Sequence, residues 1–483
     1  GMPSSFTILL ALLAIVAVVT VIVSGTSGGA VTAARLSDFC TAPIKGFADA
    51  LPVCLFVMIL GGFLGMMTET GALDNGIAVL VQKLKGNEIM LIPVLMLIFS
   101  LGGTTYGMCE ETVPFYALLA ATMMAAGFDP MVGAATVLLG AGCGCLGSTV
   151  NPFAVGAAVD ALTGVDIAVN QSIIIGLGAV LWLVTTVMSI VFVMNYAKKV
   201  KADKGSTILS MQELKDAEEA HGKAASEVHK EVKLTGRQKG VLIAFAFTFV
   251  VMIVGFIPLA DLNEGVANFF DAGAVYDADG NAVVQGWSAL ITGLPIGQWY
   301  FDEASTWFFL MAVLIGIIGG LSEKQIVNTF ITGAADMMSV VLVIALARGI
   351  SVLMANTGLD VFVLDAAANA LAGLSGVIFA PMSFLVYFGL SFLIPSTSGM
   401  ATVSMPIMGP LAVKLGFSPE VMVMIFSAAI GVVNLFTPTS GAIMGGLALA
   451  KIEWTTWLKF ALKLIVALSV VCAVILTVAC VLI

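Results

Sequence analysis

The sequence predicts an all-α polytopic membrane protein with two inverted repeats, two re-entrant hairpins and two broken helices. Three observations support this fold class. Of the 483 residues, 60% are hydrophobic and only 10% are charged, whereas soluble proteins carry about 25% charged residues. Apolar runs recur at lengths that can cross a bilayer. Motifs of the first half recur in the second half at a nearly constant spacing, which indicates an internal repeat.

The composition excludes several classes of protein. A chain this apolar cannot cover its surface with polar groups, so its solvent must be lipid. Its 20 Lys and Arg residues give no basic footprint for nucleic acid. Long apolar runs, rather than ten-residue alternating strands, exclude an outer-membrane barrel. The seven cysteines show neither metal-ligand nor disulfide spacing, and both histidines fall in a charged loop. We therefore expect no cofactor.

Nine apolar runs are long enough to cross the membrane. They lie near residues 6–25, 48–67, 130–163, 170–196, 240–259, 306–320, 329–355, 417–450 and 457–482. The runs 130–163 and 417–450 are interrupted by Gly, Pro and polar residues, which predicts broken helices. Segments 88–126 and 376–414 each have two short apolar arms around a polar centre. They predict re-entrant hairpins, whose irregular backbone must be buried in protein or face water.

The chain divides into two repeats joined by a charged linker. The first repeat, with its amino-terminal helix, occupies residues 1–197, and the linker occupies 198–239. An additional helix and the second repeat occupy 240–483. Residues 127–130 (GFDP) recur as 416–419 (GFSP), 289 positions later. Because the predicted topology runs the two copies in opposite directions, the repeats are expected to be inverted, as in secondary transporters.

Charge sets the expected orientation. The linker contains ten Lys or Arg residues, so the positive-inside rule places it in the cytoplasm. The loop at 260–303 has seven acidic residues and no Lys or Arg, which places it outside. Nine crossings then put the amino terminus inside and the carboxyl terminus outside, in a bacterial inner membrane. Trp454 and Trp457 are expected at the inner membrane interface.

Four polar stretches interrupt the helices, at 102–112, 147–152, 395–402 and 434–441. Proline removes a backbone donor and breaks a helix, which frees carbonyl oxygens. Those oxygens, with Ser, Thr and Asn oxygens, suit a hard cation such as Na⁺, while freed amides and positive half-helix ends suit a carboxylate. This combination predicts cation-coupled transport of an organic anion or zwitterion.

The candidate site residues come from these four stretches. The predicted substrate-binding residues are Thr104, Thr105, Glu110, Glu111, Thr112, Ser148, Asn151, Ser396, Thr397, Ser398, Asn434, Thr437, Thr439 and Ser440. The predicted cation-binding residues, with Na⁺ as the expected ion, are Gly103, Thr149, Asn151, Thr402 and Pro438. No metal-ligand set and no nucleophile–base pair is present, so we predict no enzymatic activity.

Charged residues at membrane depth are costly and therefore mark a functional site or a wet cavity. Glu110 and Glu111 are adjacent, so their side chains would diverge by about 100° on a helix. One is expected to face the substrate while the other caps the helical arm. Arg348 is expected to pair either with a substrate carboxylate or with a structural acid, and the sequence leaves both open.

Several motifs resemble a known family. Residues 103–108 (GTTYGM) and 110–115 (EETVPF) resemble the C4-dicarboxylate anaerobic carrier family, as do 147–153 (GSTVNPF), 347–349 (ARG) and 395–399 (PSTSG). The similarity is greatest to its branch assigned as basic amino-acid antiporters, within the larger ion transporter superfamily. The resemblance implies a homodimer with a fixed scaffold and elevator-type transport domains. It also implies that hairpin tips and broken helices hold the substrate and usually Na⁺.

Together these observations predict a secondary active transporter of a small carboxylate-bearing metabolite, either a dicarboxylate or an amino acid. Its expected partners are that substrate, the lipid bilayer and a second copy of the chain, with no nucleic acid. Na⁺ is the expected coupling ion. The alternative is proton-driven antiport of basic amino acids, such as arginine/ornithine exchange, with Glu110 or Glu111 binding the cation. An ion channel would need a continuous polar pore, which paired broken helices oppose.

Overall fold

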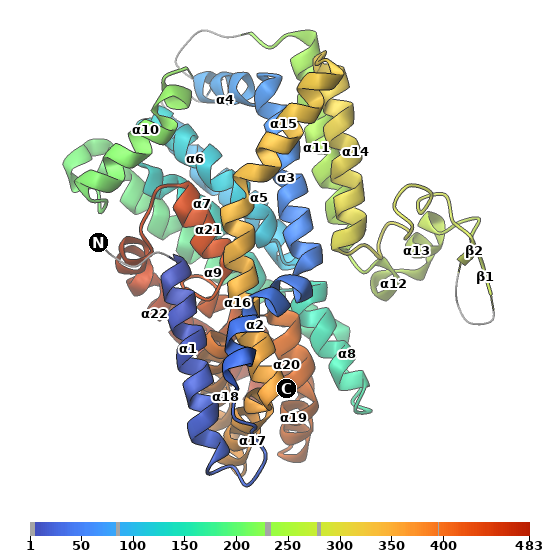
Figure 1. Ribbon diagram of the computed structural model, residues 1–483. Helices are drawn as coiled ribbons and strands as arrows, with labels where there is room; N and C mark the ends of the chain where they lie inside the picture. The colour runs from blue at the N-terminus through green and yellow to red at the C-terminus, as the bar shows by residue number, and fades with distance from the viewer. Residues whose placement is uncertain (1–4, 84–86, 228–232, 278–281, 395) are drawn as a thin grey trace.

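The computed structural model describes residues 5–83, 87–227, 233–277, 282–394 and 396–483, most of which are helical (Figure 1). The first half contains α1 (Ser5–Ser24), α2 (Leu36–Asp49), α3 (Leu51–Glu69), α4 (Ala72–Lys83), α5 (Leu91–Tyr106), α6 (Val113–Ala125), α7 (Pro130–Leu146), α8 (Ala157–Thr163) and α9 (Gln171–Ala202). The linker forms α10 (Met211–Glu227).

The second half begins with α11 (Gly236–Phe256) and a short exposed segment that contains α12 (Leu259–Leu262), α13 (Glu264–Phe270), β1 (Val275–Tyr276) and β2 (Ala282–Val284). The two strands pair antiparallel. The remaining helices are α14 (Phe301–Gly319), α15 (Glu323–Asp336), α16 (Met338–Thr357), α17 (Leu359–Leu371), α18 (Gly376–Leu393), α19 (Thr397–Lys414), α20 (Pro419–Val433), α21 (Gly441–Leu449) and α22 (Trp454–Leu482).

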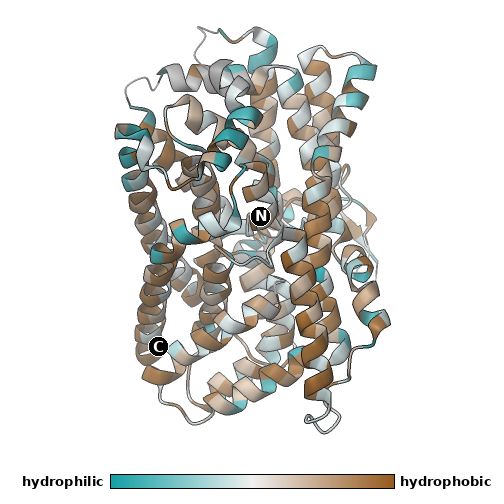
Figure 2. Ribbon diagram, turned by 60° about the vertical axis from the view of Figure 1, so that its left-hand side comes forward, coloured by the Kyte–Doolittle hydropathy of each residue, from teal (hydrophilic) through white to brown (hydrophobic). Residues whose placement is uncertain are grey.

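Eight helices in the described part of the chain are long and apolar enough to cross a membrane. They are α1, α3, α5 with the turn before it, α9, α11, α14, α16 and α22. On α22, Val466, Val470 and Val474 are each more than half exposed. Residues four apart share one face of a helix, so these valines form an apolar stripe on the outer surface. Figure 2 shows apolar residues along the long helices and hydrophilic residues gathered toward the upper end.

The run at 329–355, expected as a single span, is divided into two helices. α15 ends at Asp336 and α16 begins at Met338. α15 also starts earlier than expected, at a capping box. Ser322 Oγ accepts from the Gln325 N–H, and the Ser322 N–H donates to Gln325 Oε1. The local signal for the division is the charged Asp336, which is followed at once by the apolar Met337 and Met338.

α7 and α20 form the centre of the molecule. Every residue of α20 from Glu420 to Val433 is buried, and α7 and α20 contact each other. A Cβ atom added at Gly431 would lie 2.4 Å from the Leu146 Cα, and one added at Gly142 would lie 2.2 Å from Leu435 Cδ2. Glycine at both positions therefore lets the two helices cross in close contact.

The helix bounds recur along the chain. α2 and α15, α3 and α16, and α4 and α17 begin 287 residues apart (323 − 36, 338 − 51 and 359 − 72). α7 and α20 begin 289 residues apart (419 − 130). Both of these last helices start with Pro at N1 after a side-chain cap, Asp129 or Ser418. Both follow a glycine with positive φ, at 88° for Gly127 and 82° for Gly416.

The two helical hairpins approach the centre from different ends. α6 contacts α10, which lies at the upper end of Figure 1 with α4 and α15. α18 and α19 instead contact α17, at the lower end of the same view. The turn of the first hairpin and the tip of the second consequently meet near α7 and α20.

Candidate functional site

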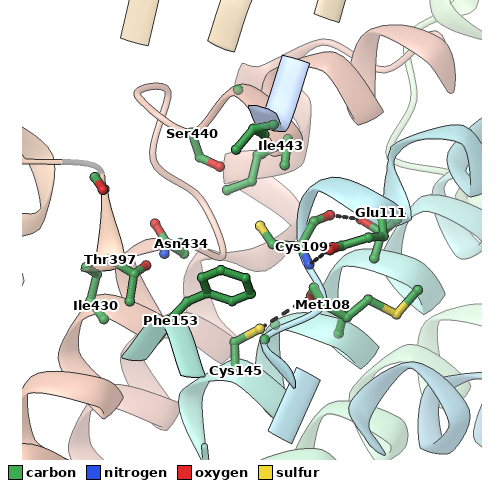
Figure 3. Close-up of a pocket in the computed structure, with 18 of the residues that line it drawn as sticks. Met108, Cys109, Glu111, Cys145, Phe153, Thr397, Ile430, Asn434, Ser440 and Ile443 are labelled. Carbon is green, nitrogen blue, oxygen red and sulfur yellow. Dashed lines mark hydrogen bonds between the residues drawn. The ribbon is translucent and has the colours of Figure 1, made fainter. Parts of the chain in front are cut away.

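A cavity of about 160 Å³ lies where the first hairpin turn, the second hairpin tip and the breaks after α7 and α20 meet (Figure 3). Ten of its described lining residues have charged, amide, Ser or Thr side chains: Glu111, Thr112, Asn151, Arg348, Ser396, Thr397, Ser398, Asn434, Thr439 and Ser440. Nine of these ten, all except Arg348, are predicted substrate-binding residues. Segments from both halves of the chain thus form one site.

The first hairpin turn holds a buried carboxylate. The Cys109 N–H donates to Glu111 Oε2 at 2.9 Å, and the Glu111 side chain is 1% exposed. Thr112 Oγ1 donates to the Cys109 carbonyl at 2.5 Å, which closes the turn (Figure 3). The side chain of Glu110 lies outside the described part of the structure. The expected division of roles between the two glutamates therefore stays a prediction.

Asn151 shapes the break after α7. Its Nδ2 donates to Ser148 Oγ at 3.0 Å, and its Oδ1 accepts from the Phe153 N–H at 2.9 Å. Ser148 Oγ in turn donates to the Cys145 carbonyl at 2.6 Å, one of the carbonyls near the helix end. Gly107, with a φ of 79°, lies so close that an added Cβ would be 2.5 Å from Asn151 Oδ1. The break after α7 and the turn of the first hairpin are therefore in close contact at Gly107 and Asn151.

Thr104 fastens the first hairpin to the same break. Its Oγ1 donates to the Gly147 carbonyl at 2.6 Å, and its own carbonyl accepts from the N–H and the hydroxyl of Thr149. Thr105 donates to the Leu101 carbonyl within its own helix. Neither Thr104 nor Thr105 is among the residues that line the cavity. Their hydroxyls serve the backbone of the hairpin and the break.

The break after α20 has its carbonyls satisfied by tryptophans. Trp454 Nε1 donates to the Phe436 carbonyl at 2.7 Å, and Trp457 Nε1 donates to the Leu435 carbonyl at 2.8 Å. Trp457 is fully buried, and its place at the inner membrane interface stays a prediction. Asn434 lines the cavity, and its buried Oδ1 has no hydrogen-bond partner among the described residues. A buried polar atom of this kind requires an explanation.

The hydroxyls beyond this break are partly paired with one another. Thr437 Oγ1 and Thr439 Oγ1 are 2.7 Å apart, and both side chains are buried. Thr439 and Ser440 line the cavity, whereas Thr437 and, across the site, Ser148 do not. Thr437 therefore supports Thr439 from behind the cavity wall.

Arg348 connects α16 to the second hairpin tip. Its Nη1 donates to Ser396 Oγ at 3.1 Å and forms an ion pair with Asp49 Oδ2 at 3.2 Å. Ser396 also caps α19 by accepting from the Gly399 N–H. Among the described lining residues, Arg348 is the one basic side chain and Glu111 the one acidic side chain. The cavity therefore has a positive and a negative side.

The assignment of the five predicted cation-binding residues stays a prediction. Asn151 lines the cavity, whereas Gly103, Thr149, Thr402 and Pro438 are not among its lining residues. Thr402 Oγ1 donates to the Ser398 carbonyl within α19. The sequence also gave no reason to expect the aromatic wall, in which the rings of Phe153 and Phe301 stack with centroids 5.3 Å apart. Phe301 follows the acidic loop, and only tertiary structure brings it here.

A second, larger cavity of about 710 Å³ lies between α3, α6 and α15. Glu69, Asp336 and His221 contribute to its lining. His221 Nε2 lies 3.1 Å from the Leu449 carbonyl, and burial lowers the pKa of its imidazole below 6.5. The linker helix α10 thus reaches the end of α21.

A buried apolar cluster separates the two cavities. We call this cluster the apolar seam; its members are Ala50, Val53, Cys54, Val57, Val113, Met337, Val340, Val341, Ile344 and Ala442. Val53, Ile344 and Ala442 line the smaller cavity, and Met337 lines the larger one. The seam is therefore a wall common to both.

Family comparison places the chain among carriers. The family described as DcuC, C4-dicarboxylate anaerobic carrier, matches residues 30–481. The chain belongs to this family. As a C4-dicarboxylate anaerobic carrier family member it is a multi-pass membrane protein related to transporters rather than to enzymes.

Two relatives of this family member align over most of its length. An uncharacterized protein of Haemophilus influenzae is 28% identical over 445 residues, which are 92% of this chain and 78% of the relative. An Escherichia coli K12 protein named "Putative basic amino acid antiporter YfcC" is 27% identical over 440 residues, which are 89% of this chain and 77% of the relative.

Two solved structures resemble the family member more distantly. Neisseria gonorrhoeae MtrF, reported with a class of antimetabolite efflux pumps, gives a TM-score of 0.47 at 17% identity and covers 100% of this chain and 96% of its own. The Alcanivorax borkumensis YdaH transporter gives 0.47 at 16% identity and covers 97% of each chain. At these values neither likeness bears on function.

Proposed function

We propose that this carrier is a secondary active transporter of the bacterial inner membrane that moves a small carboxylate-bearing metabolite, a dicarboxylate or an amino acid. The cavity at the meeting point of both hairpins and both helix breaks carries this proposal. Its polar wall is drawn from broken helices at the centre of the fold, which is where secondary transporters hold their substrates. In this proposal the amino terminus is inside, the carboxyl terminus is outside and the transporter is a homodimer.

Two inverted repeats and an elevator mechanism form part of the proposal. The helix starts that recur 287 and 289 residues apart support the repeats, as do the hairpins that approach from different ends. In this scheme α2, α3, α15 and α16, which pack on one another, belong to the scaffold. The hairpins pack on α7 and α20 and belong to the moving part. The apolar seam then lies between scaffold and moving part.

The charges of the cavity favour an amino acid over a dicarboxylate. Arg348 is the one basic side chain in the described lining, so the second carboxylate of a dicarboxylate would have to rely on hydroxyls and backbone amides. An amino acid can place its carboxylate toward Arg348 and its ammonium group toward Glu111, since opposite charges in a desolvated site attract strongly. The name of the Escherichia coli relative, which refers to basic amino acid antiport, agrees with this choice.

Na⁺ remains the proposed coupling ion, and proton coupling is the second candidate. Each of the Leu435 and Phe436 carbonyls accepts one tryptophan N–H and keeps a second lone pair, which agrees with Na⁺ as a ligand at this break. In the proton-coupled alternative Glu111 carries the proton and the reaction is exchange of basic amino acids. Replacing Glu111 by Gln should then abolish the dependence of uptake on a pH gradient.

Uptake by purified protein in proteoliposomes tests the proposal. Vesicles loaded with L-lysine, L-glutamate or succinate are diluted into the same radiolabelled compound, first without a gradient and then with an Na⁺ or a pH gradient. Exchange of at least one carboxylate that saturates with concentration and is lost in Asn151→Ala supports the proposal. Flux that rises linearly without saturation would indicate a channel. Uptake stimulated by the pH gradient alone would replace Na⁺ with protons.

A further inference from the structure

We infer that Arg348 is the residue of the cavity that recognises a substrate carboxylate. In the absence of substrate, Asp49 pairs with Arg348, and the substrate carboxylate exchanges with it. The inference rests on the proposed function and specifies how that site recognises a carboxylate. Its basis is the way the guanidinium is occupied in the structure.

Within the described part of the chain, one nitrogen of the Arg348 guanidinium is engaged. Nη1 serves both Ser396 Oγ and Asp49 Oδ2, and these are its partners among the described residues. A guanidinium presents five N–H donors in a rigid fork that fits a carboxylate in bidentate fashion. Nε and Nη2 therefore remain for a ligand, at a side chain that lines the cavity. The Ser396 bond keeps the group turned toward the hairpin tip.

Asp49 is placed to be a weak partner. Its side chain is 50% exposed, against 27% for Arg348, and exposed ion pairs are easily exchanged. It is also the last residue of α2, and a carboxylate is disfavoured at a helix carboxyl terminus because of the helix dipole. A substrate carboxylate bound within the cavity would meet less solvent than Asp49 does. It can consequently displace Asp49 or share the guanidinium with it.

The chain supplies a matched control. Asp336 is the last residue of α15, and Asp49 is the last residue of α2. The two residues are 287 positions apart (336 − 49), the same offset that relates the starts of these helices. It lines the larger cavity rather than the site. Replacing it by Asn removes one negative charge from an equivalent helix end, without removing an anion that contacts Arg348.

The test compares ligands that differ only in the carboxylate. Thermal stabilisation of detergent-purified full-length protein is titrated with L-lysine, L-glutamate and succinate, each beside its carboxamide. In the wild type at least one carboxylate should bind more tightly than its amide. At low salt, Asp49→Asn should raise the affinity for that carboxylate about two- to fivefold, the range expected for an exposed ion pair. The affinity for the amide should not change. The increase should shrink at high salt. Asp336→Asn should behave as the wild type.

The Arg348→Gln variant distinguishes a role in carboxylate recognition from a merely structural role. Arg348→Gln should bring the affinities of carboxylate and amide together, and adding Asp49→Asn to it should have no further effect. The inference fails, while the proposed transport stands, in either of two cases in which a carboxylate binds. In the first, Asp49→Asn and Asp336→Asn have the same affinity for the carboxylate. In the second, Arg348→Gln still binds the carboxylate more tightly than its amide. If no carboxylate in the panel binds, both the inference and the proposed transport fail.

Discussion

The crossing of α7 and α20 gives a quantitative test of the fold around the cavity. A Cβ at Gly431 would lie 2.4 Å from the Leu146 Cα, and ordinary contacts begin at 3.4 Å. The helices would have to separate by about 1.0 Å (3.4 − 2.4), because a backbone atom cannot rotate away. Overpacking of this kind costs about 1–3 kcal/mol. The helical preference of Ala over Gly returns only about 0.5–1 kcal/mol. Gly431→Ala should therefore destabilise the protein.

Two other glycines calibrate the measurement. At Gly142 the added Cβ meets only the far end of the Leu435 side chain, so Gly142→Ala should cost less than Gly431→Ala. Gly389 in α18 has nothing within 4 Å, so Gly389→Ala should be neutral or stabilising by up to about 1 kcal/mol. Melting midpoints in detergent should rise from Gly431→Ala through Gly142→Ala to Gly389→Ala. Uptake should fall in both Gly431→Ala and Gly142→Ala, because both glycines line the cavity, and more in Gly431→Ala, where the contact is with backbone. A Gly431→Ala protein as stable as Gly389→Ala would refute the reasoning.

Three further predictions concern the polar groups of the structure. Asn434→Leu should abolish uptake while the melting midpoint stays the same or rises, since removing an unpaired buried amide oxygen relieves a penalty; unchanged uptake would contradict a role in the site. Trp457→Phe should lower stability by about 1–3 kcal/mol, because the Leu435 carbonyl loses its donor, and an unchanged midpoint would count against that bond. Burial lowers the pKa of His221 in the folded state, so at acidic pH the unfolded chain binds more protons and the protein loses stability as the pH drops. The melting midpoint should therefore decline less steeply with falling pH in His221→Gln than in the wild type. Parallel curves for the two proteins would contradict this.

The sequence was sufficient for the features that depend on local composition. Long apolar runs such as that of α22 and breaks at Gly147 and Pro438 are visible in the residues themselves, because hydropathy and proline act locally. α2 was missed, since it is a short helix with Pro43 inside it and no long apolar run. The division at Met337 was not predicted, although the charged Asp336 directly before it interrupts the apolar run.

The same distinction between local and tertiary information applies to the site residues. Asn151, Asn434 and the hydroxyls of the second hairpin tip could be selected because polar groups at membrane depth are rare. The sequence could not distinguish a hydroxyl that lines the cavity from one that supports the backbone behind it, as Thr104 and Thr437 do. The choice of Asp49 as the partner of Arg348 required the packing of α2 on α16.

The bonds that close the two helix breaks also bear on how the chain is made. Thr104 and Ser148 satisfy carbonyls of the first break from within the first half, and Trp454 and Trp457 do the same within the second half. Domains generally fold in the order of synthesis. The first half can accordingly complete its irregular backbone while the ribosome is still translating the linker, without exposing unpaired carbonyls to lipid. What must wait for the second half is the glycine crossing of α7 with α20, and with it the closed cavity.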